Sequence, residues 1–395
     1  MVAQALTPWE GGPCYSIAAL VSHLQPHATI TLLCKQGHID YSFTKQHGLS
    51  EVLEFHRPEI LEALRDSDHW VQNLLDQAHV VHFNGHWQWE EALLARICAQ
   101  RNIPYIHQPR GMFLVGHRKR WLKKCYNTVL GNGMASHATR VVALSQFETN
   151  QFLPYPIDPK KIVTIPNGIT AVHDEKLVSL QRHSNPHIKV DVPYFFYLGR
   201  LEHRKNLLFL LDAYLEYRHR GGTAKLVLMG PSEHGYERNL HEYVRAHQCH
   251  DVVQIGLPVY DEERWLYMNR SIATVYPSVQ EAFGRVPFEA ISSGTFTIVP
   301  SFSGAAEYLK PFLPECLFDL SDPDSLTDAL QRVEAMRSRN ETHALLAARQ
   351  WVHERLSWTS IAQQFYDLYS EIIVETSRVP RAEPTLPPQL LGTAV

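Results

Sequence analysis

The chain has 395 residues, of which 45% are hydrophobic and 20% charged, and its formal net charge is −4 at pH 7. This length and composition predict a folded protein of two or three domains that buries a sizeable core. The slightly acidic balance excludes the overall basic field typical of nucleic-acid-binding proteins, so we expect no nucleic-acid partner, although a local basic patch stays open.

Neither the cysteines nor the N-terminal stretch indicates export. The six cysteines are scattered without a CxxC pair, a spacing that favours neither a zinc site nor a disulfide framework. The N-terminal stretch lacks a basic segment leading into an apolar one, and no apolar run reaches about 18 residues. We therefore expect a cytoplasmic protein without a membrane span.

In the first half of the chain, short apolar runs alternate with stretches whose apolar residues recur every three or four positions. The expected strands are 28–34, 79–85, 104–109, 139–145 and 161–168, and the expected helices are 13–25, 58–78 and 89–102. Because ten residues precede Gly11, the first strand of this half is expected to be short, at "VAQAL" (2–6), or absent.

The second half repeats the alternation. The expected strands are 194–200, 224–230, 251–256, 271–278, 295–301 and 316–320, and the expected helices are 206–220, 239–249 and 261–271. About five strands in each half predict an α/β protein of two Rossmann-like domains, each a parallel sheet wrapped by helices.

The domain boundary is expected in the polar, histidine-rich and proline-broken stretch 167–193. This gives an N-terminal domain at 1–168 and a C-terminal domain at 169–359. A last helix at 360–376 and a flexible, proline-rich tail at 377–395 follow.

Two glutamates, Glu281 and Glu289, flank a glycine turn in "EAFGRVPFE". The expected strand 271–278 precedes them, Pro287 suits the first turn of a helix, and Gly294 suits its end. Ligands bind at the carboxyl ends of parallel strands, where a helix N-terminus offers N–H groups to a diphosphate. Carboxylates there suit the vicinal hydroxyls of a ribose or hexose, so a sugar nucleotide fits all these parts.

A loop with two cations follows the expected strand 194–200. "GRLEHRKN" presents Arg200 and Lys205 before the next helix. Fixed cations there stabilise the charge that develops on a departing diphosphate, and this role can replace magnesium. The alternative is that both cap a sheet edge or pair with Glu202.

Several motifs, taken together, resemble the retaining GT-B glycosyltransferases of family four. "EAFGRVPFE" resembles the family's E-x7-E motif and "GRLEHRKN" its GR-x4-K loop. "GGPCYSIAALVSHL" resembles its N-terminal glycine loop, "IPNGI" its interdomain turn, and "LSWTSIAQQFYDLY" its closing helix. The resemblance implies the GT-B fold, two Rossmann-like domains facing across a cleft. The donor would bind to the C-terminal domain and the acceptor to the N-terminal one, onto which the last helix packs back.

The resemblance also implies roles for individual donor-side residues. Glu289 would hold the ribose hydroxyls and Glu281 would lie by the transferred sugar, while Arg200 and Lys205 would bind the diphosphate. The remaining implied donor-binding residues are Gly11, Gly12, Phe283, Gly284 and Arg285. No protein nucleophile is generally agreed for this family, so we assign none in this chain.

The acceptor side departs from the family pattern. In "HQPRGM", Arg110 takes a place where relatives often carry a histidine, and His107 lies three residues earlier. In "VVHFNGHW", Asn84 falls where a second histidine is common. We take Asn84, His107 and Arg110 as acceptor-binding candidates. Arg110 as an interface ion pair and His107 as a structural histidine remain alternatives.

No metal or cofactor is expected. The chain lacks HExxH, GxGxxG and a GKS or GKT loop. "DSD" at 66–68 and "DPD" at 322–324 match the metal motif of the other glycosyltransferase fold. The first lies in the expected helix 58–78 and the second in an N-cap region.

A basic stretch at 117–130, "HRKRWLKKCYNTVL", contains five Lys or Arg and no acid. A basic helix with an apolar face suits an anionic membrane surface, where lipid-linked acceptors reside. A solvated helix face is the alternative.

The resemblance implies an enzyme that transfers a sugar from a nucleotide-diphosphate sugar to a glycan or lipid-linked glycan, with retention and without a metal. Bacterial surface polysaccharide synthesis at the inner face of the membrane is the expected setting. Two other interpretations stay open: a nucleotide-sugar epimerase or hydrolase of the same fold, and a catalytically silent membrane scaffold.

Overall fold

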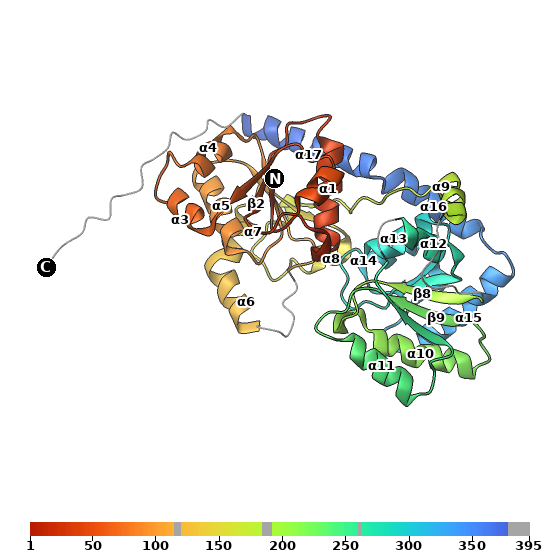
Figure 1. Ribbon diagram of the computed structural model, residues 1–395. Helices are drawn as coiled ribbons and strands as arrows, with labels where there is room; N and C mark the ends of the chain where they lie inside the picture. Colours follow the sequence, from red (N-terminus) through yellow and green to blue (C-terminus); the bar gives the residue numbers. More distant parts are fainter. Residues whose placement is uncertain (114–119, 184–191, 260–261, 378–395) are drawn as a thin grey trace. The chain divides into compact units, whose positions relative to one another are not determined.

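The computed structural model describes residues 1–113, 120–183, 192–259 and 262–377, and the chain divides into two compact units (Figure 1). Unit 1 comprises Met1–Ala143, Gln151–Ile165 and Ala362–Val395, and unit 2 comprises Leu144–Asn150 and Pro166–Ile361. The expected boundary at 168 lies three residues beyond the end of the middle segment of unit 1. The expected tail lies almost wholly outside the described residues.

Unit 1 is built on a parallel sheet in the order β3-β2-β1-β4-β5-β6-β7. Its strands are β1 (Val2–Ala3), β2 (Leu32–Lys35), β3 (Val52–Phe55), β4 (Val81–Asn84), β5 (Tyr105–Gln108), β6 (Arg140–Ala143) and β7 (Ile162–Thr164). The first strand is short, as expected, yet both of its neighbours pair with it. The sequence missed β3, an edge strand whose half-buried residues show no clear alternation.

The helices of unit 1 lie between these strands. They are α1 (Gly12–Leu24), α2 (Tyr41–Gln46), α3 (Arg57–Ala63), α4 (Trp70–Gln77), α5 (Trp89–Gln100), α6 (Arg120–Tyr126), a π-helical turn (Asn127–Gly131) and α7 (Asn132–Ser136). Short 3-10 helices span Pro8–Glu10 and Pro159–Lys161. The long helix α17 (Trp358–Ser377) begins in unit 2 and joins unit 1 from Ala362.

The prediction of one helix over 58–78 was wrong, because α3 and α4 are separate. Asp66 Oδ1 accepts from the backbone N–H of Asp68 at 2.9 Å, and His69 Nδ1 accepts from Val71 N at 3.3 Å. Such side chains compete with helical hydrogen bonds and begin a new helix instead. "DSD" therefore lies in an exposed break between helices.

Both faces of the unit 1 sheet are buried. Alternate residues of its strands, such as Val2, Leu33 and Phe83, pack in one cluster with α3, α4 and α5. Their neighbours Ala3 and Leu32 pack in another cluster with α1. This alternation is what a parallel sheet covered on both faces requires.

Unit 2 holds a six-stranded parallel sheet in the order β10-β9-β8-β11-β12-β13. Its strands are β8 (Tyr194–Leu198), β9 (Lys225–Met229), β10 (Val253–Gly256), β11 (Ala273–Val275), β12 (Phe296–Pro300) and β13 (Leu317–Phe318). All six lie within the predicted ranges.

The helices of unit 2 follow the same alternation. They are α8 (Gln146–Asn150), α9 (Asp174–His183), α10 (Leu207–His219), α11 (Glu237–Ala246), α12 (Glu263–Arg270), α13 (Arg285–Ser292), α14 (Gly304–Leu309), α15 (Pro323–Ser338) and α16 (His343–Arg355). Short 3-10 helices span His203–Lys205 and Pro314–Cys316. Within the described ranges, none of the helices has the length and apolar character needed to cross a membrane.

In both sheets the strand order reverses next to the first strand, between β1 and β4 in unit 1 and between β8 and β11 in unit 2. This is the doubly wound Rossmann order, in which ligands bind at the carboxyl ends of the strands beside the reversal. The prediction of two Rossmann-like domains is confirmed, and each reversal marks an edge on which to look for function.

Candidate functional site

The loops that leave β8 and β11 bring Lys205 and Glu281 together. Lys205 Nζ donates to Glu281 Oε2 at 2.7 Å, to Tyr276 Oη at 2.8 Å and to Ser278 Oγ at 3.3 Å. Tyr276 and Ser278 donate to the same carboxylate oxygen at 3.1 and 3.0 Å. One buried lysine therefore anchors a partly exposed carboxylate at the edge of the sheet.

This network keeps Glu281 ionised. Burial opposes the charged form, but the charge of Lys205 and the hydrogen bonds that Lys205, Ser278 and Tyr276 donate lower the pKa of Glu281 to about 2. The hydrogen bonds that Glu281 accepts from Lys205, Tyr276 and Ser278 all end on Oε2, so the network leaves Oε1 to accept from a ligand hydroxyl.

The turn after Glu281 requires glycine. Gly284 has φ +74°, and a Cβ there would lie 3.2 Å from Glu281 Cγ. The Phe283 side chain is buried and stacks on Phe288 at 4.6 Å between ring centroids. Phe283 thus holds the turn, and its backbone rather than its ring is placed to meet a ligand.

Glu289 lies on α13, one turn beyond Gly284, between two arginines. Arg285 Nη2 donates to Glu289 Oε1 at 2.9 Å, and Arg264 Nε of α12 lies 3.3 Å from Oε2. Although burial opposes ionisation, these two guanidinium groups lower the pKa of Glu289. No motif or spacing pointed to Arg264, which comes from a different helix. Gly294 follows the end of α13 with φ +78°, as predicted.

Arg200 follows β8 but lies outside the Lys205 network. Its guanidinium is half-exposed and pairs with Glu233 at 3.0 Å and Glu202 at 3.4 Å. The expected alternative of pairing with Glu202 is thus present for Arg200, whereas Lys205 pairs with Glu281.

In unit 1, the glycine loop lies where β1 leads into α1. Gly11 is the N-cap of α1 with φ +79°, and a Cβ on Gly11 or Gly12 would have no atom within 4 Å. The positive φ, rather than crowding within the unit, calls for glycine at Gly11.

Asn84 and Arg110 lie together at the ends of β4 and β5. Arg110 Nε and Nη2 both donate to Asn84 Oδ1, at 3.0 and 2.8 Å. The amide group of Asn84 in turn donates to the Val2 carbonyl at 3.2 Å. The central strand, the amide and the guanidinium therefore form one chain of contacts, with Arg110 in a left-handed conformation at φ 52°.

His107 does not join these residues. Its Nε2 lies 2.8 Å from the Gly85 carbonyl oxygen, and its ring stacks on His86 at 5.3 Å. Burial, and secondarily His86, lower the pKa of His107 to about 3. This setting is that of a neutral histidine inside the fold, the alternative left open for it.

Two glycosyltransferase family models match the chain, one in each half. The family "Glycosyl transferases group 1" matches residues 181–348, and the family "Glycosyl transferase 4-like domain" matches residues 42–168. The chain belongs to the GT-B glycosyltransferase superfamily. The GT-B fold is thereby confirmed for the two Rossmann-like units described above.

Individual relatives are distant. The uncharacterized glycosyltransferase MJ1607 of Methanocaldococcus jannaschii is 28% identical over 183 residues, 46% of each chain. The lipopolysaccharide 1,2-N-acetylglucosaminetransferase of Salmonella typhimurium is 23% identical over 233 residues, 57% of this chain and 60% of that one. The chain spans about half the length of the curated relatives it matches.

A solved structure matches nearly the whole chain. Anabaena Alr3699/HepE, in complex with UDP and glucose, superposes with a TM-score of 0.72 at 18% identity, covering 94% of this chain and 98% of that one. At this identity the likeness establishes the GT-B fold.

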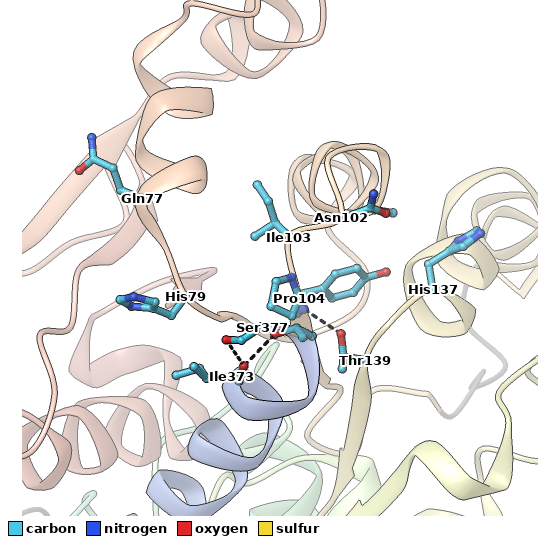
Figure 2. Close-up of a pocket in the computed structure, with 12 residues that line it drawn as sticks. Gln77, His79, Asn102, Ile103, Pro104, His137, Thr139, Ile373 and Ser377 are labelled. Carbon is cyan, nitrogen blue, oxygen red and sulfur yellow. Dashed lines mark hydrogen bonds between the residues drawn. The ribbon is translucent and has the colours of Figure 1, made fainter. Parts of the chain in front are cut away.

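A separate pocket of about 840 Å³ lies at the opposite edge of the unit 1 sheet. Figure 2 shows His79 and His137 on either side of Pro104, with Ile373 and Ser377 of α17 at its base. These residues precede strands or end a helix, so the pocket lies at the amino ends of the strands. Ligands of Rossmann-like folds bind at the carboxyl ends of the strands instead, on the opposite side of the sheet from this pocket.

Across the described ranges, no three His, Cys, Asp or Glu side chains are placed to hold a metal ion. Asp322 caps α15 by accepting from Asp324 N at 3.0 Å, so "DPD" begins a helix.

Proposed function

We propose that this chain transfers a sugar from a nucleoside-diphosphate sugar to a hydroxyl of a glycan or lipid-linked glycan. The observation that carries the proposal is the Lys205–Glu281 network beside Gly284, at the strand-order reversal of unit 2. It joins a lysine cation, an ionised carboxylate and a glycine turn at the carboxyl ends of the strands, where Rossmann-like folds bind nucleotides. The HepE structure with UDP and glucose supports the choice of donor.

Each end of the donor has a matching group in unit 2. The carboxylate of Glu289 has lone pairs beyond those used by Arg264 and Arg285, enough for two ribose hydroxyls. The N-terminus of α13 after Gly284 presents backbone N–H groups suited to the diphosphate. Oε1 of Glu281 suits a hydroxyl of the transferred sugar.

The proposed reaction proceeds with retention. The bond between the sugar C1 and the diphosphate oxygen breaks, and the acceptor oxygen forms its bond on the same face. The acceptor proton passes to the departing phosphate oxygen. Lys205 and Arg200 stabilise the charge on that leaving group, a role proposed to make a divalent metal unnecessary.

The acceptor is proposed to bind unit 1 through Arg110, which Asn84 orients. The lipopolysaccharide enzyme among the relatives supports bacterial surface polysaccharide assembly as the setting. We place the enzyme in the cytoplasm, at the inner face of the membrane.

Thermal unfolding with UDP, GDP and ADP, each with and without EDTA, tests the donor site. A ligand at 100 times its dissociation constant adds about 2.7 kcal/mol of stability. We expect one of the three nucleotides to raise the unfolding temperature of the protein, by the same amount with and without EDTA. No shift with any nucleotide contradicts the function, and loss of the shift in EDTA contradicts metal independence. Consumption of donor without an acceptor would instead indicate a hydrolase.

We further propose that the α6 patch, defined as Trp121, Leu122, Lys123, Lys124 and Val129, contacts an anionic membrane. Trp121, Leu122 and Val129 are 68%, 43% and 76% exposed. The stretch 117–130 has five Lys or Arg and no acid, although 117–119 lie outside the described residues. Exposed apolar groups among basic ones suit the interface of an anionic bilayer.

Flotation with phosphatidylglycerol vesicles and with phosphatidylcholine vesicles tests this contact. Wild type should float with the anionic vesicles, and Lys123→Gln/Lys124→Gln should lose most of this binding. Lys45→Gln/Lys160→Gln removes the same charge from exposed positions of unit 1 outside the α6 patch and should bind normally. Equal binding by both double variants, or none by wild type, contradicts the membrane contact.

A further inference from the structure

A second acid–base cluster lies at the carboxyl ends of β8 and β9 in unit 2. Arg200 Nη1 donates to Glu233 Oε2 at 3.0 Å, and Arg200 Nη2 lies 3.4 Å from Glu202 Oε1. The same oxygen of Glu202 lies 3.6 Å from Arg204 Nη2. The guanidinium proposed for the diphosphate is thus already paired with two carboxylates of its own chain.

The backbone places Glu233 in this cluster. A Cβ on Gly230 would stand 1.8 Å from the carbonyl oxygen of Gly199, so the loops after β8 and β9 touch backbone to backbone. Leu201 N donates to Pro231 O at 2.9 Å, and Glu233 N donates back to Leu201 O at 3.1 Å. These bonds hold the start of the Glu233 side chain against the Arg200 loop.

The two carboxylates differ in their freedom to move. The side chain of Glu202 is 11% exposed, whereas that of Glu233 is 34% exposed. Partial burial opposes ionisation of Glu233, but the charge of Arg200 helps to hold its pKa below the usual value. Glu233 is therefore charged at neutral pH and is the partner that can turn away into water.

We propose that Glu233 is a counter-ion that the diphosphate displaces from Arg200. The inference rests on the proposed function and deepens it. A guanidinium binds a carboxylate and a phosphate through the same planar N–H groups, so the two anions compete for Arg200. On binding, the Nη1–H bond to Glu233 breaks, a bond to a phosphate oxygen forms, and the Glu233 carboxylate turns to solvent. Glu233 acts through Arg200 and positions no sugar itself.

This exchange has a use after transfer. The released nucleoside diphosphate carries one more ionisable oxygen than the donor and would otherwise bind the cations more tightly. The return of Glu233 to Arg200 offsets part of that attraction and assists release, a step that often limits turnover.

The test is calorimetric titration with whichever of UDP, GDP and ADP stabilises the wild type most. Glu233→Gln should lower the dissociation constant two- to fivefold, about the factor that an exposed ion pair is worth. Glu237→Gln is the matched control, because Glu237 begins α11 four residues later, carries the same charge and pairs with His241 at 3.4 Å. It should leave the affinity unchanged.

A second pair of titrations separates competition from a structural role. In an Arg200→Gln background, Glu233→Gln should give no gain in affinity. Equal or weaker binding by Glu233→Gln than by wild type overturns the exchange, as does an equal gain in Glu237→Gln or a gain that survives without Arg200. In those cases the wild type still binds, so the proposed function stands. Failure of the wild type to bind any of the three nucleotides overturns both.

Discussion

Lys205 Nζ and Glu281 Oε2 lie 2.7 Å apart although 76 residues separate them in the sequence. The lysine is buried, whereas the carboxylate lies partly exposed at the carboxyl ends of the strands, so the negative group of the pair is the one that a ligand can reach. Glu281 is thereby fixed in position and charge before any sugar meets it, a condition for catalysis by preorganised groups.

Replacing Glu281 by glutamine should separate catalysis from nucleotide binding. Transfer is expected to fall by about 10²-fold or more, the loss typical when one preorganised polar group is removed. Nucleoside diphosphate affinity should change little, because Glu281 is assigned to the sugar. Steady-state rates and calorimetry measure the two effects. Glu237→Gln serves again as control, and a matching fall in nucleotide affinity would contradict the assignment.

Replacing Lys205 by methionine should destabilise unit 2, because it leaves the Glu281 carboxylate without its cation. Since Glu281 is still 26% exposed, the expected loss is about 1–3 kcal/mol, below that of a fully buried pair. Urea unfolding measures it. Lys205→Met/Glu281→Gln should recover part of the loss, and a double variant no more stable than Lys205→Met would argue against coupling.

The same pair predicts an acid dependence of stability. The pKa of Glu281 is lowered from its ordinary value of 4.5 to about 2 in the folded chain. A carboxyl with a lowered pKa contributes stability above its unfolded pKa, and this contribution disappears as the pH falls from 4.5 towards 2. The free energy of unfolding should therefore fall more between pH 7 and pH 3 in wild type than in Glu281→Gln. Identical drops would mean that the pair does not shift the pKa.

Replacing Glu289 by alanine should weaken nucleotide binding at least about tenfold, because two hydrogen bonds to a charged acceptor are lost. Calorimetry with the preferred nucleoside diphosphate measures the change, and the free nucleobase provides a comparison that lacks the ribose. Equal nucleotide affinity in wild type and Glu289→Ala would contradict the ribose assignment.

Gly284→Ala should damage the site beyond the cost of its backbone conformation. At φ +74° alanine costs about 1–2 kcal/mol, and its Cβ would press on Glu281 Cγ at 3.2 Å. Gly221→Ala is the matched control, with φ +92° and no atom within 4 Å of its Cβ. Both variants should lose stability in thermal unfolding, and Gly284→Ala alone should lose transfer. Equal activity in the two would mean that the turn tolerates a side chain.

The sequence predicted the sheets well because buried parallel strands are continuous apolar runs. β3 was missed because an edge strand is only half buried, and the helix at 58–78 was over-extended because Asp66 binds backbone locally. Both failures concern segments at the surface of the unit, where apolar periodicity carries little information.

For the candidate site, spacing predicted Glu281, Glu289, Arg200 and Lys205 as candidates. It did not show that Lys205 would pair with Glu281 and Arg200 with Glu233, because these contacts join loops far apart in the chain. Tyr276 had a readable signal, a polar residue at the end of a buried strand. Arg264 and Glu233 had none, since exposed helices and loops are rich in such residues.

The chain passes between its two units at 143/144, 150/151, 165/166 and 361/362, so neither unit is one continuous stretch. Leu144–Asn150 belongs to unit 2 and is tied there, since Ser145 Oγ donates to the Ala282 carbonyl at 2.6 Å. A single recombination point near residue 168 would therefore exchange neither unit whole. A chimera meant to change the donor must carry 144–150 and 166–361 together. One that leaves 144–150 behind separates the E-x7-E turn from its own Ser145 and so loses the matched hydrogen bond to the Ala282 carbonyl.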